Sequence, residues 1–244
     1  MHLELSELLA CPRCGPGQGL VVSVDRIEDR RVREGLLACP GCDARYSIGE
    51  GGIDFGAAAD GGPGAGVADT RDGPASGESG TRSGPEGRGD HTRAGPREVG
   101  APAPDPEDAV RVAALLGLQE GGGAILLGAG LGRAAPRVAE LAGGVEVLAL
   151  YGAPDGAAAP RVTRLLGVRA GALPLRGGRL RGAALLGGSP DGLAEATRAV
   201  RPGGRVAVLR PRPELDVPGG LPLRVLAAEA AAVVAERTTE GPGA

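Results

Sequence analysis

Ala124-Ile-Leu-Leu-Gly-Ala-Gly-Leu-Gly132 is the stretch of sequence that decides the fold. Its four apolar residues predict a short buried strand, and the glycines at 128, 130 and 132 predict a tight turn into a helix. Such a loop brings the backbone close to a nucleotide-like ligand, although many strand-to-helix turns use glycine for steric reasons alone. Arg133 stands where a dinucleotide-binding loop needs its third glycine. We therefore take Gly128, Gly130 and Gly132 as candidate cofactor-binding residues.

Strand and helix patterns alternate on both sides of this loop, which predicts a Rossmann-like, doubly wound and mostly parallel sheet over residues 105 to 244. No clear final strand remains after Arg237, so we expect a truncated sheet. The expected helices are 105–116, the segment from the loop to about 142, 161–166, 191–200 and 221–230. The expected strands are 124–127, 145–150, a short one at 168, 182–186, 205–209 and a candidate at 233–237.

Two further passages carry a resemblance in the same order along the chain. Leu173-Pro-Leu175 precedes a glycine turn and a strand, and Arg201-Pro-Gly-Gly204 precedes the strand at 205–209. Together with the glycine loop, they make about residues 105 to 238 resemble the class I S-adenosylmethionine-dependent methyltransferases. The resemblance implies that S-adenosylmethionine would lie against Gly128, Gly130 and Gly132. It also places Tyr151, after the second strand, beside the cofactor, where it either packs at the loop edge or stacks on adenine.

The sequence departs from this family at the acidic positions that hold the cofactor. In the family these carboxylates follow or open the strands and bond the ribose, the adenine and the loop. The matching residues here are Leu126, Leu150 or Tyr151, Arg169 and Arg181. A ribose hydroxyl pair without a partner costs binding energy. We therefore expect ordinary cofactor binding to be lost.

The chain's four cysteines form two short motifs with the same Cys-x-x-Cys spacing, Cys11-Pro-Arg-Cys14 and Cys39-Pro-Gly-Cys42. Two such knuckles supply the four tetrahedral ligands that structural zinc prefers, and four thiolates leave no open position for a substrate. A thioredoxin-like redox pair and two disulfides are the alternatives. A redox motif, however, opens a helix, and disulfides suit a secreted chain.

Short apolar runs surround the knuckles and predict a small β zinc ribbon over residues 1 to 55. Residues 20–24 and 33–37 are expected strands joined by a charged connection at 26–31, and residues 46–48 and 53–55 flank the glycine turn 49–52. The pattern Leu8-Leu-Ala-Cys11, Leu37-x-Cys39 and Arg45-Tyr-Ser-Ile48 resembles the small zinc-ribbon proteins related to the Trm-type activator of methyltransferases. That resemblance implies a ribbon that binds and stabilises a methyltransferase partner.

Between the two patterned regions, residues 56 to 104 consist mainly of Gly, Pro, Ala, Ser, Asp and Arg. This composition cannot bury enough apolar surface to offset the entropy of ordering, so we expect a disordered linker. The expected organisation is thus a ribbon (1–55), a linker (56–104) and a methyltransferase-like domain (105–244).

Composition limits the partners. The formal net charge of −3 gives no general attraction to nucleic acid, and aromatic residues make up only 1% of the chain, so base-stacking platforms are scarce. We find neither a signal peptide pattern nor an apolar run long enough to cross a membrane, and expect a cytoplasmic protein.

Two functions remain open. One is a non-catalytic, protein-binding or methyltransferase-associated scaffold. The other is an active methyltransferase on RNA, protein or a small molecule, with an altered cofactor site. The missing carboxylates favour the scaffold.

Overall fold

The computed structural model describes residues 1–59, 106–119, 121–151, 159–169, 171–211 and 220–239. The N-terminal ribbon, which we define as residues 1–59, contains η1 (Leu3–Leu8), β1 (Val21–Glu28), β2 (Arg31–Ala38), β3 (Arg45–Gly49) and β4 (Gly52–Ala59). The α/β part, which we define as the described residues from 106 onward, begins with α1 (Pro106–Leu115), β5 (Ala124–Leu127), η2 (Gly132–Ala134), α2 (Ala135–Leu141) and β6 (Glu146–Tyr151). It continues with β7 (Val162–Leu166), β8 (Leu180–Leu186), α3 (Pro190–Ala199), β9 (Val200–Leu209), β10 (Leu223–Glu229) and β11 (Ala232–Arg237).

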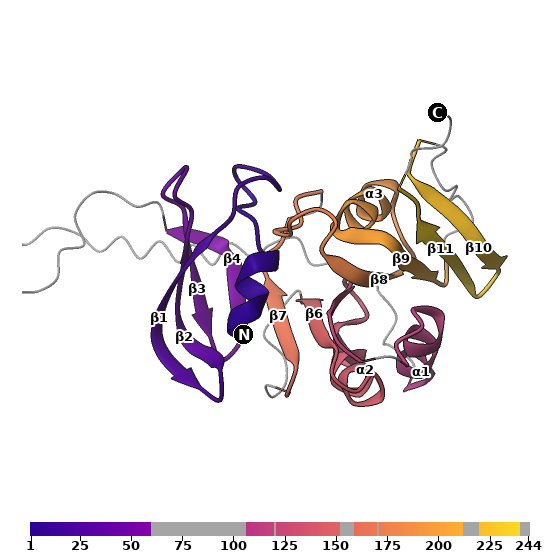
Figure 1. Ribbon diagram of the computed structural model, residues 1–244, viewed down its shortest axis with the longest axis horizontal. Coiled ribbons are helices and arrows are strands. Elements are labelled where there is room, and N and C mark those ends of the chain that lie inside the picture. The colour runs from indigo at the N-terminus through magenta and orange to yellow at the C-terminus, as the bar shows by residue number, and fades with distance from the viewer. Residues whose placement is uncertain (60–105, 120, 152–158, 170, 212–219, 240–244) are drawn as a thin grey trace, which may run out of the picture.

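All these strands belong to one sheet, in the order β1-β2-β3-β4-β7-β6-β5-β8-β9-β11-β10 (Figure 1). The middle of the sheet, from β4 to β9 in this order, is parallel, and both ends are antiparallel. From β5 the chain first adds β6 and β7 on one side and then returns to add β8 and β9 on the other. The order therefore reverses at β5, and ligands of such sheets bind at the carboxyl ends of the strands beside the reversal.

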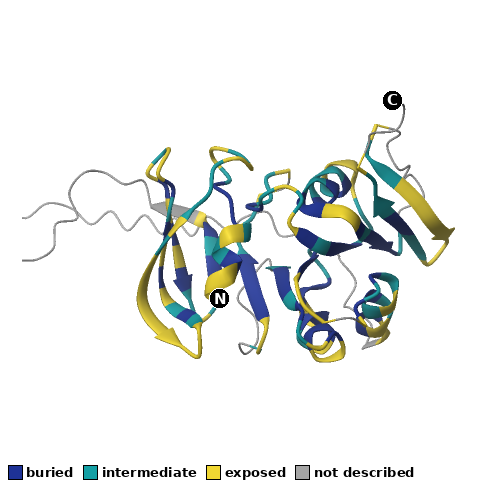
Figure 2. Ribbon diagram, viewed as in Figure 1, coloured by how far each residue is buried: buried dark blue, intermediate teal, exposed yellow. Residues whose placement is uncertain are grey.

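Helices cover both faces of the parallel strands. Successive strand residues point to opposite faces and therefore pack against different helices. Ile125 and Leu127 pack with α1 and α2, whereas Leu126 packs with α3 and with the apolar residues of the ribbon. Figure 2 shows the buried strands in the middle of the sheet and the exposed edge strands β1 and β10 at its ends. The expected Rossmann-like, doubly wound α/β fold is confirmed.

Several expected elements differ from those observed. Residues 161–166 are not a helix but include the buried strand β7, whose β-branched residues Val162 and Thr163 suit a strand between two neighbours. Residues 221–230 were also expected as a helix but include the strand β10. β10 and β11 make an antiparallel hairpin whose second strand pairs with β9. The sheet is therefore not cut short at this end.

The first hairpin of the ribbon is also tighter than expected. The charged residues of the connection at 26–31 lie largely within strands, and only Asp29 and Arg30 form the turn, with φ values of 48° and 61°. Two consecutive residues with positive φ are typical of a type I′ hairpin turn, whose twist matches that of the strands.

The ribbon joins the α/β part through a parallel pair of strands. β4 pairs with β7 at Ile53↔Leu165 and Asp54↔Leu166. Glycines allow the two backbones to approach here: a Cβ on Gly52 would lie 2.5 Å from the Arg164 carbonyl oxygen, and one on Gly167 would lie 2.3 Å from the Gly56 nitrogen. β4 continues to Ala59, past the expected ribbon boundary, and the rest of the predicted linker lies outside the described residues.

Candidate metal centre and glycine loop

Each cysteine motif forms a tight turn that holds its two thiols on one side. The Gly15 amide donates to the Cys11 carbonyl, and the Asp43 amide donates to the Cys39 carbonyl. The residue after the second cysteine has positive φ in both turns, 92° at Gly15 and 56° at Asp43. The two turns are therefore built alike, as expected for knuckles that face one centre.

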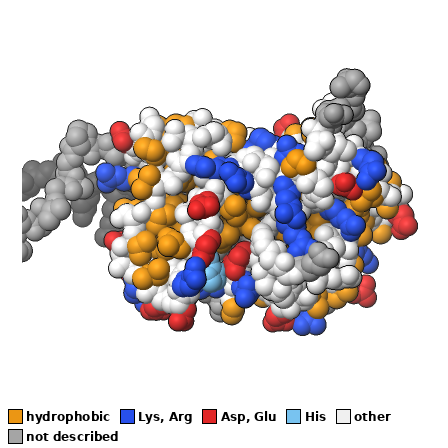
Figure 3. Space-filling view, viewed as in Figure 1, with side chains coloured by type: hydrophobic (Ala, Val, Ile, Leu, Met, Phe, Trp, Pro, Cys, Tyr) orange, Lys and Arg blue, Asp and Glu red, His pale blue; other side chains and the backbone are white. Residues whose placement is uncertain are grey.

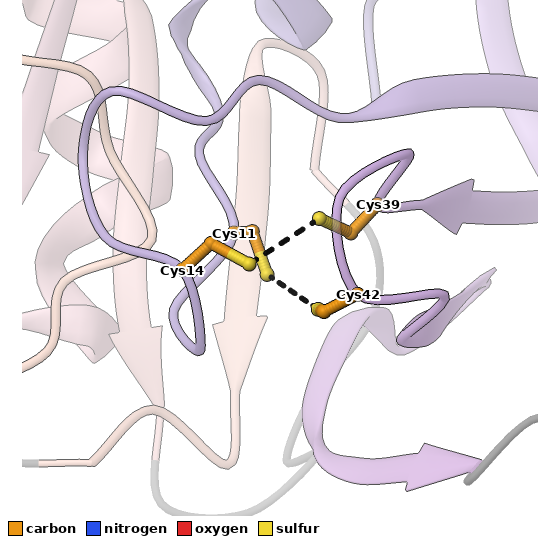
Figure 4. Close-up of side chains that lie close together, drawn as sticks. All are labelled: Cys11, Cys14, Cys39 and Cys42. Carbon is orange, nitrogen blue, oxygen red and sulfur yellow. Dashed lines mark hydrogen bonds between the residues drawn. The ribbon is translucent and has the colours of Figure 1, made fainter.

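The four sulfurs gather into a compact group, which Figure 4 shows with two thiols contributed from each side. All four lie within 4.8 Å of one another, and the Cys11–Cys42 and Cys14–Cys39 sulfur distances are both 3.7 Å. A tetrahedron with metal–sulfur bonds of about 2.3 Å has edges of about 3.8 Å. The thiols are free rather than joined in disulfides. The spacing thus fits a tetrahedral ion such as zinc.

Tyr46 is a functional candidate that the sequence indicated only as part of the expected strand at 46–48 and of the Arg45-Tyr-Ser-Ile48 pattern. Its buried hydroxyl lies 3.5 Å from the Cys11 sulfur, and its ring packs 5.0 Å from that of Phe55. Burial opposes ionisation of the Cys11 thiol, but the hydrogen bonds from Tyr46 and from the backbone at Cys14 and Arg13 outweigh it and lower the pKa of Cys11 to about 7. Tyr46 therefore supports a thiolate at Cys11.

The thiols differ in their exposure and in their ease of ionisation. Cys11 and Cys39 are buried, Cys42 is half-buried and Cys14 is exposed. Hydrogen bonding to Cys42, followed by burial, raises the pKa of Cys14 to about 12. A cation among the sulfurs would favour the ionised form of all four, because opposite charge lowers the pKa of a thiol.

The first knuckle is tied directly to the α/β part. The Ala10 amide donates to the Pro174 carbonyl, and the Arg176 amide donates to the Leu8 carbonyl. The Leu173-Pro-Leu175 passage, singled out in the sequence, is thus bonded to the segment that leads into Cys11. Pro174 and Leu175 are buried in this contact.

The glycine loop leaves β5 at its carboxyl end, next to the reversal of strand order. The Gly128 amide donates to the Ala184 carbonyl on β8, and Gly130 has a φ of 85°. A Cβ on Gly128 would lie 2.8 Å from Cδ2 of Leu185. The loop therefore has the position of a cofactor loop, but packing and backbone shape already account for Gly128 and Gly130.

The residues at the positions where the resembled family has carboxylates lie in different environments. Leu126 is fully buried in the core. Arg181 donates to the carbonyls of Gly117 and Gly122, at the amino end of β8 and away from the glycine loop. Arg169 is exposed, and Tyr151 ends β6, although its side chain lies outside the described residues.

No family model and no curated protein matches the chain. Among solved structures, it is similar to the antibiotic-resistance methyltransferase Kmr, with 16% identity over 54% of this chain and 93% of that one, and a TM-score of 0.38. It is also similar to the tRNA (m1A58) methyltransferase TrmI from Aquifex aeolicus, with 15% identity over 55% of this chain and 70% of that one, and a TM-score of 0.39.

A third structure is phosphoethanolamine N-methyltransferase 2 from Haemonchus contortus in complex with S-adenosylmethionine, with 16% identity over 42% of this chain and 27% of that one, and a TM-score of 0.34. The chain spans less than half the length of two further matched methyltransferases, 47% and 45%. Likeness this distant carries no argument about activity. The fold assignment rests on the sheet order and the glycine loop of this chain.

Proposed function

We propose that the chain is a methyltransferase-like protein with a built-in zinc ribbon, and that it acts through protein contacts rather than methyl transfer. The ribbon resembles proteins that bind a methyltransferase partner. Here β4 extends the sheet of the α/β part in the same chain. This pairing supports the idea that the partner of the ribbon is supplied in cis.

In this proposal zinc is structural and is held by Cys11, Cys14, Cys39 and Cys42. The sulfur distances of 3.7 Å support it, and four protein ligands would leave no position for substrate. The free thiols also suit a reducing compartment, which supports a cytoplasmic location in this proposal.

The burial of Leu126 is the observation that best supports a non-catalytic function. The family has a carboxylate at this position of the first strand, whereas here the side chain is fully buried between Leu148 and Ala183 in the apolar core. A charged group in that setting would lose its hydration without gaining a partner. The site is therefore better suited to packing than to holding a cofactor loop.

Protein contacts are supported by the two edge strands. Val21 on β1 and Val225 on β10 are 59% and 47% exposed, and neither edge is paired within the described part of the chain. An exposed edge with apolar side chains is a ready surface for strand addition. The net charge of −3 gives less support to nucleic acid. No helix in the described residues has the length and apolar character needed to cross a membrane.

An active methyltransferase is the second candidate. The glycine loop at the strand reversal favours it, since Gly128, Gly130 and Gly132 lie where such sheets bind a nucleotide-like cofactor and Gly130 has a positive φ. The loop alone does not replace the carboxylates that bond the ribose.

Calorimetric titration with S-adenosylmethionine separates the two candidates. We expect no saturable binding at micromolar concentrations. Tyr151→Asp, which restores an acid at the ribose position, should strengthen binding about tenfold or more through charge-assisted hydrogen bonds. Micromolar binding by the unmodified protein that is lost in Gly130→Val would overturn the non-catalytic proposal and favour the enzyme.

A further inference from the structure

A cavity of about 400 Å³ lies where the first hairpin of the ribbon meets the start of β7. We call it the seam cavity; it is lined by Ala159 and by His2, Asp29, Arg31, Arg33, Pro160 and Arg161. It faces the amino ends of β6 and β7, whereas the glycine loop lies at the carboxyl ends of the parallel strands. A hollow of about 30 Å³ adjoins it, sharing Arg31 and Arg33 and reaching Thr163. The seam cavity is thus separate from the cofactor loop and from the cysteines.

Two polar atoms without partners lie at these hollows. Six buried side-chain polar atoms in the described residues have no hydrogen-bond partner; among them, Arg31 belongs to the lining of both hollows and Thr163 to that of the small one, through Arg31 Nε and Thr163 Oγ1. Thr163 is only 3% exposed. Such atoms are costly to leave unpaired and call for a bound group. The two atoms are one cationic N–H donor and one hydroxyl.

Two carboxylates near the cavity, those of Glu28 and Glu146, already lie close to side chains other than Arg31. Glu28 pairs with Arg33 at 3.2 Å, and Glu146 lies 3.6 Å from His2 and 3.7 Å from Arg161. Asp29 also lines the cavity. Arg31 has no carboxylate partner in the described residues and donates only to the carbonyls of Ala159 and Val162.

The electrostatic setting agrees with an excess of positive charge around the two arginines. Burial lowers the pKa of Arg31; Glu146 opposes this shift, and Arg33 adds to it. Burial, followed by Arg31 and Arg33, also lowers the pKa of the Met1 amino group to about 6. Figure 3 shows a histidine on this face beside arginine and acidic side chains.

We propose that the seam cavity binds a small phosphate monoester that carries hydroxyl groups, of the sugar-phosphate or nucleotide class. Arg31 and Arg33 lie two residues apart on β2 and both line the cavity, and guanidinium groups match phosphate oxygens well. The carboxylate of Asp29, which lines the cavity, accepts from a ligand hydroxyl. A volume of about 400 Å³ is in the usual range for small-ligand sites.

Titration of the full zinc-loaded chain with ribose 5-phosphate, ribose, inorganic phosphate and adenosine monophosphate tests this site. Calorimetry gives the affinities, and NMR of the arginine Nε–H groups reports which side chains bind. We expect ribose 5-phosphate to bind more tightly than inorganic phosphate or ribose, and to shift the Nε–H resonances of Arg31 and Arg33. Tighter binding of adenosine monophosphate would assign the nucleotide class, and equal or weaker binding would assign the sugar phosphate.

Arg33→Gln should weaken ribose 5-phosphate binding about tenfold or more, because it removes a charge-assisted donor. Arg30→Gln is the matched control: Arg30 is a neighbouring arginine on the same hairpin, its side chain is 81% exposed and it does not line the cavity. Arg161→Gln provides a second test if Arg33→Gln fails to fold. Absence of ribose 5-phosphate binding, ribose binding equally well, or equal losses in Arg33→Gln and Arg30→Gln would overturn the proposal.

Discussion

Two side chains, Tyr46 and Leu126, determine how the candidate sites work. Tyr46 lies on β3 and its hydroxyl reaches the Cys11 sulfur across the core of the ribbon. Leu126 lies on β5 and fills the core where the resembled family has an acid. Each gives a prediction that separates packing from chemistry.

Tyr46→Phe should weaken zinc binding about tenfold or more while the ribbon stays folded. The change removes the hydrogen bond to the Cys11 sulfur, and partners of metal ligands typically contribute this much to affinity. Competition with a chelator measures the effect, starting from protein that holds one zinc. Ser47→Ala, at an exposed position of the same strand, is the control. Equal affinities in the two variants would show that the hydroxyl does not support the metal.

The pH dependence of this variant has a definite sign. Hydrogen bonding from Tyr46 contributes to the lowered pKa of Cys11, so its removal raises that pKa. Because protons compete with zinc for the thiolate, the pH at which zinc is lost should move upward in Tyr46→Phe.

Leu126→Asp should lower the free energy of unfolding by about 3 kcal/mol or more without creating S-adenosylmethionine binding. The new carboxylate would be buried among apolar side chains with no partner. Urea unfolding measures the loss. Leu226→Asp, on the edge strand β10 where the side chain is 43% exposed, should cost little. A stable Leu126→Asp variant that binds the cofactor would contradict the packing role.

At the scale of elements, the helices and strands that have a clear local sequence pattern were predicted. The apolar run of β5 and the glycine turn after it, β8, the second half of β9 and α3 all follow from short sequence signals. Residues 201–204 were expected as a turn but belong to β9, beside an irregularity in its register with β8. β7 and β10 were missed because their sequences suit helix and strand alike, and only pairing with neighbouring strands decides between them. The four-cysteine group was predictable because its spacing is specific, whereas the contact from Tyr46 depends on the path of β3.

The seam between β4 and β7 had no local signal, because Ile53 and Leu165 are far apart in the chain. The seam cavity could not be predicted either, because Arg31 and residues 159–161, which line it, are far apart in the chain. Only the glycines on each side hint at a close backbone approach. They also offer a test.

Gly167→Ala should destabilise the protein more than Gly171→Ala does. Both glycines have positive φ, 63° and 73°, so both substitutions incur a similar backbone cost of about 1–2 kcal/mol. A Cβ at 167 would also meet the Gly56 nitrogen at 2.3 Å, whereas one at 171 has nothing within 4 Å. The steric conflict should add about 1–3 kcal/mol. Equal losses in urea unfolding would mean that the seam is not closely packed in solution.

At the scale of the molecule, the ribbon and the α/β part share one sheet and one core. Residues of the ribbon such as Ile53 and Phe55 belong to the same apolar cluster as Leu126, Leu165 and α3. Because the four cysteines lie in the ribbon and β4 of the ribbon pairs with β7, we predict that zinc binding stabilises the whole sheet by linkage. This is the central claim of the account: the ribbon is a permanent structural partner of the methyltransferase-like fold.

Amide hydrogen exchange across a denaturant series, with and without zinc, tests that claim most directly. We predict that β3 in the ribbon and β8 in the α/β part lose protection at the same denaturant concentration in the zinc-loaded protein. Removal of zinc by a chelator should shift both transitions together to lower concentration. Loss of protection in β3 alone, with β8 unchanged after zinc removal, would contradict the account.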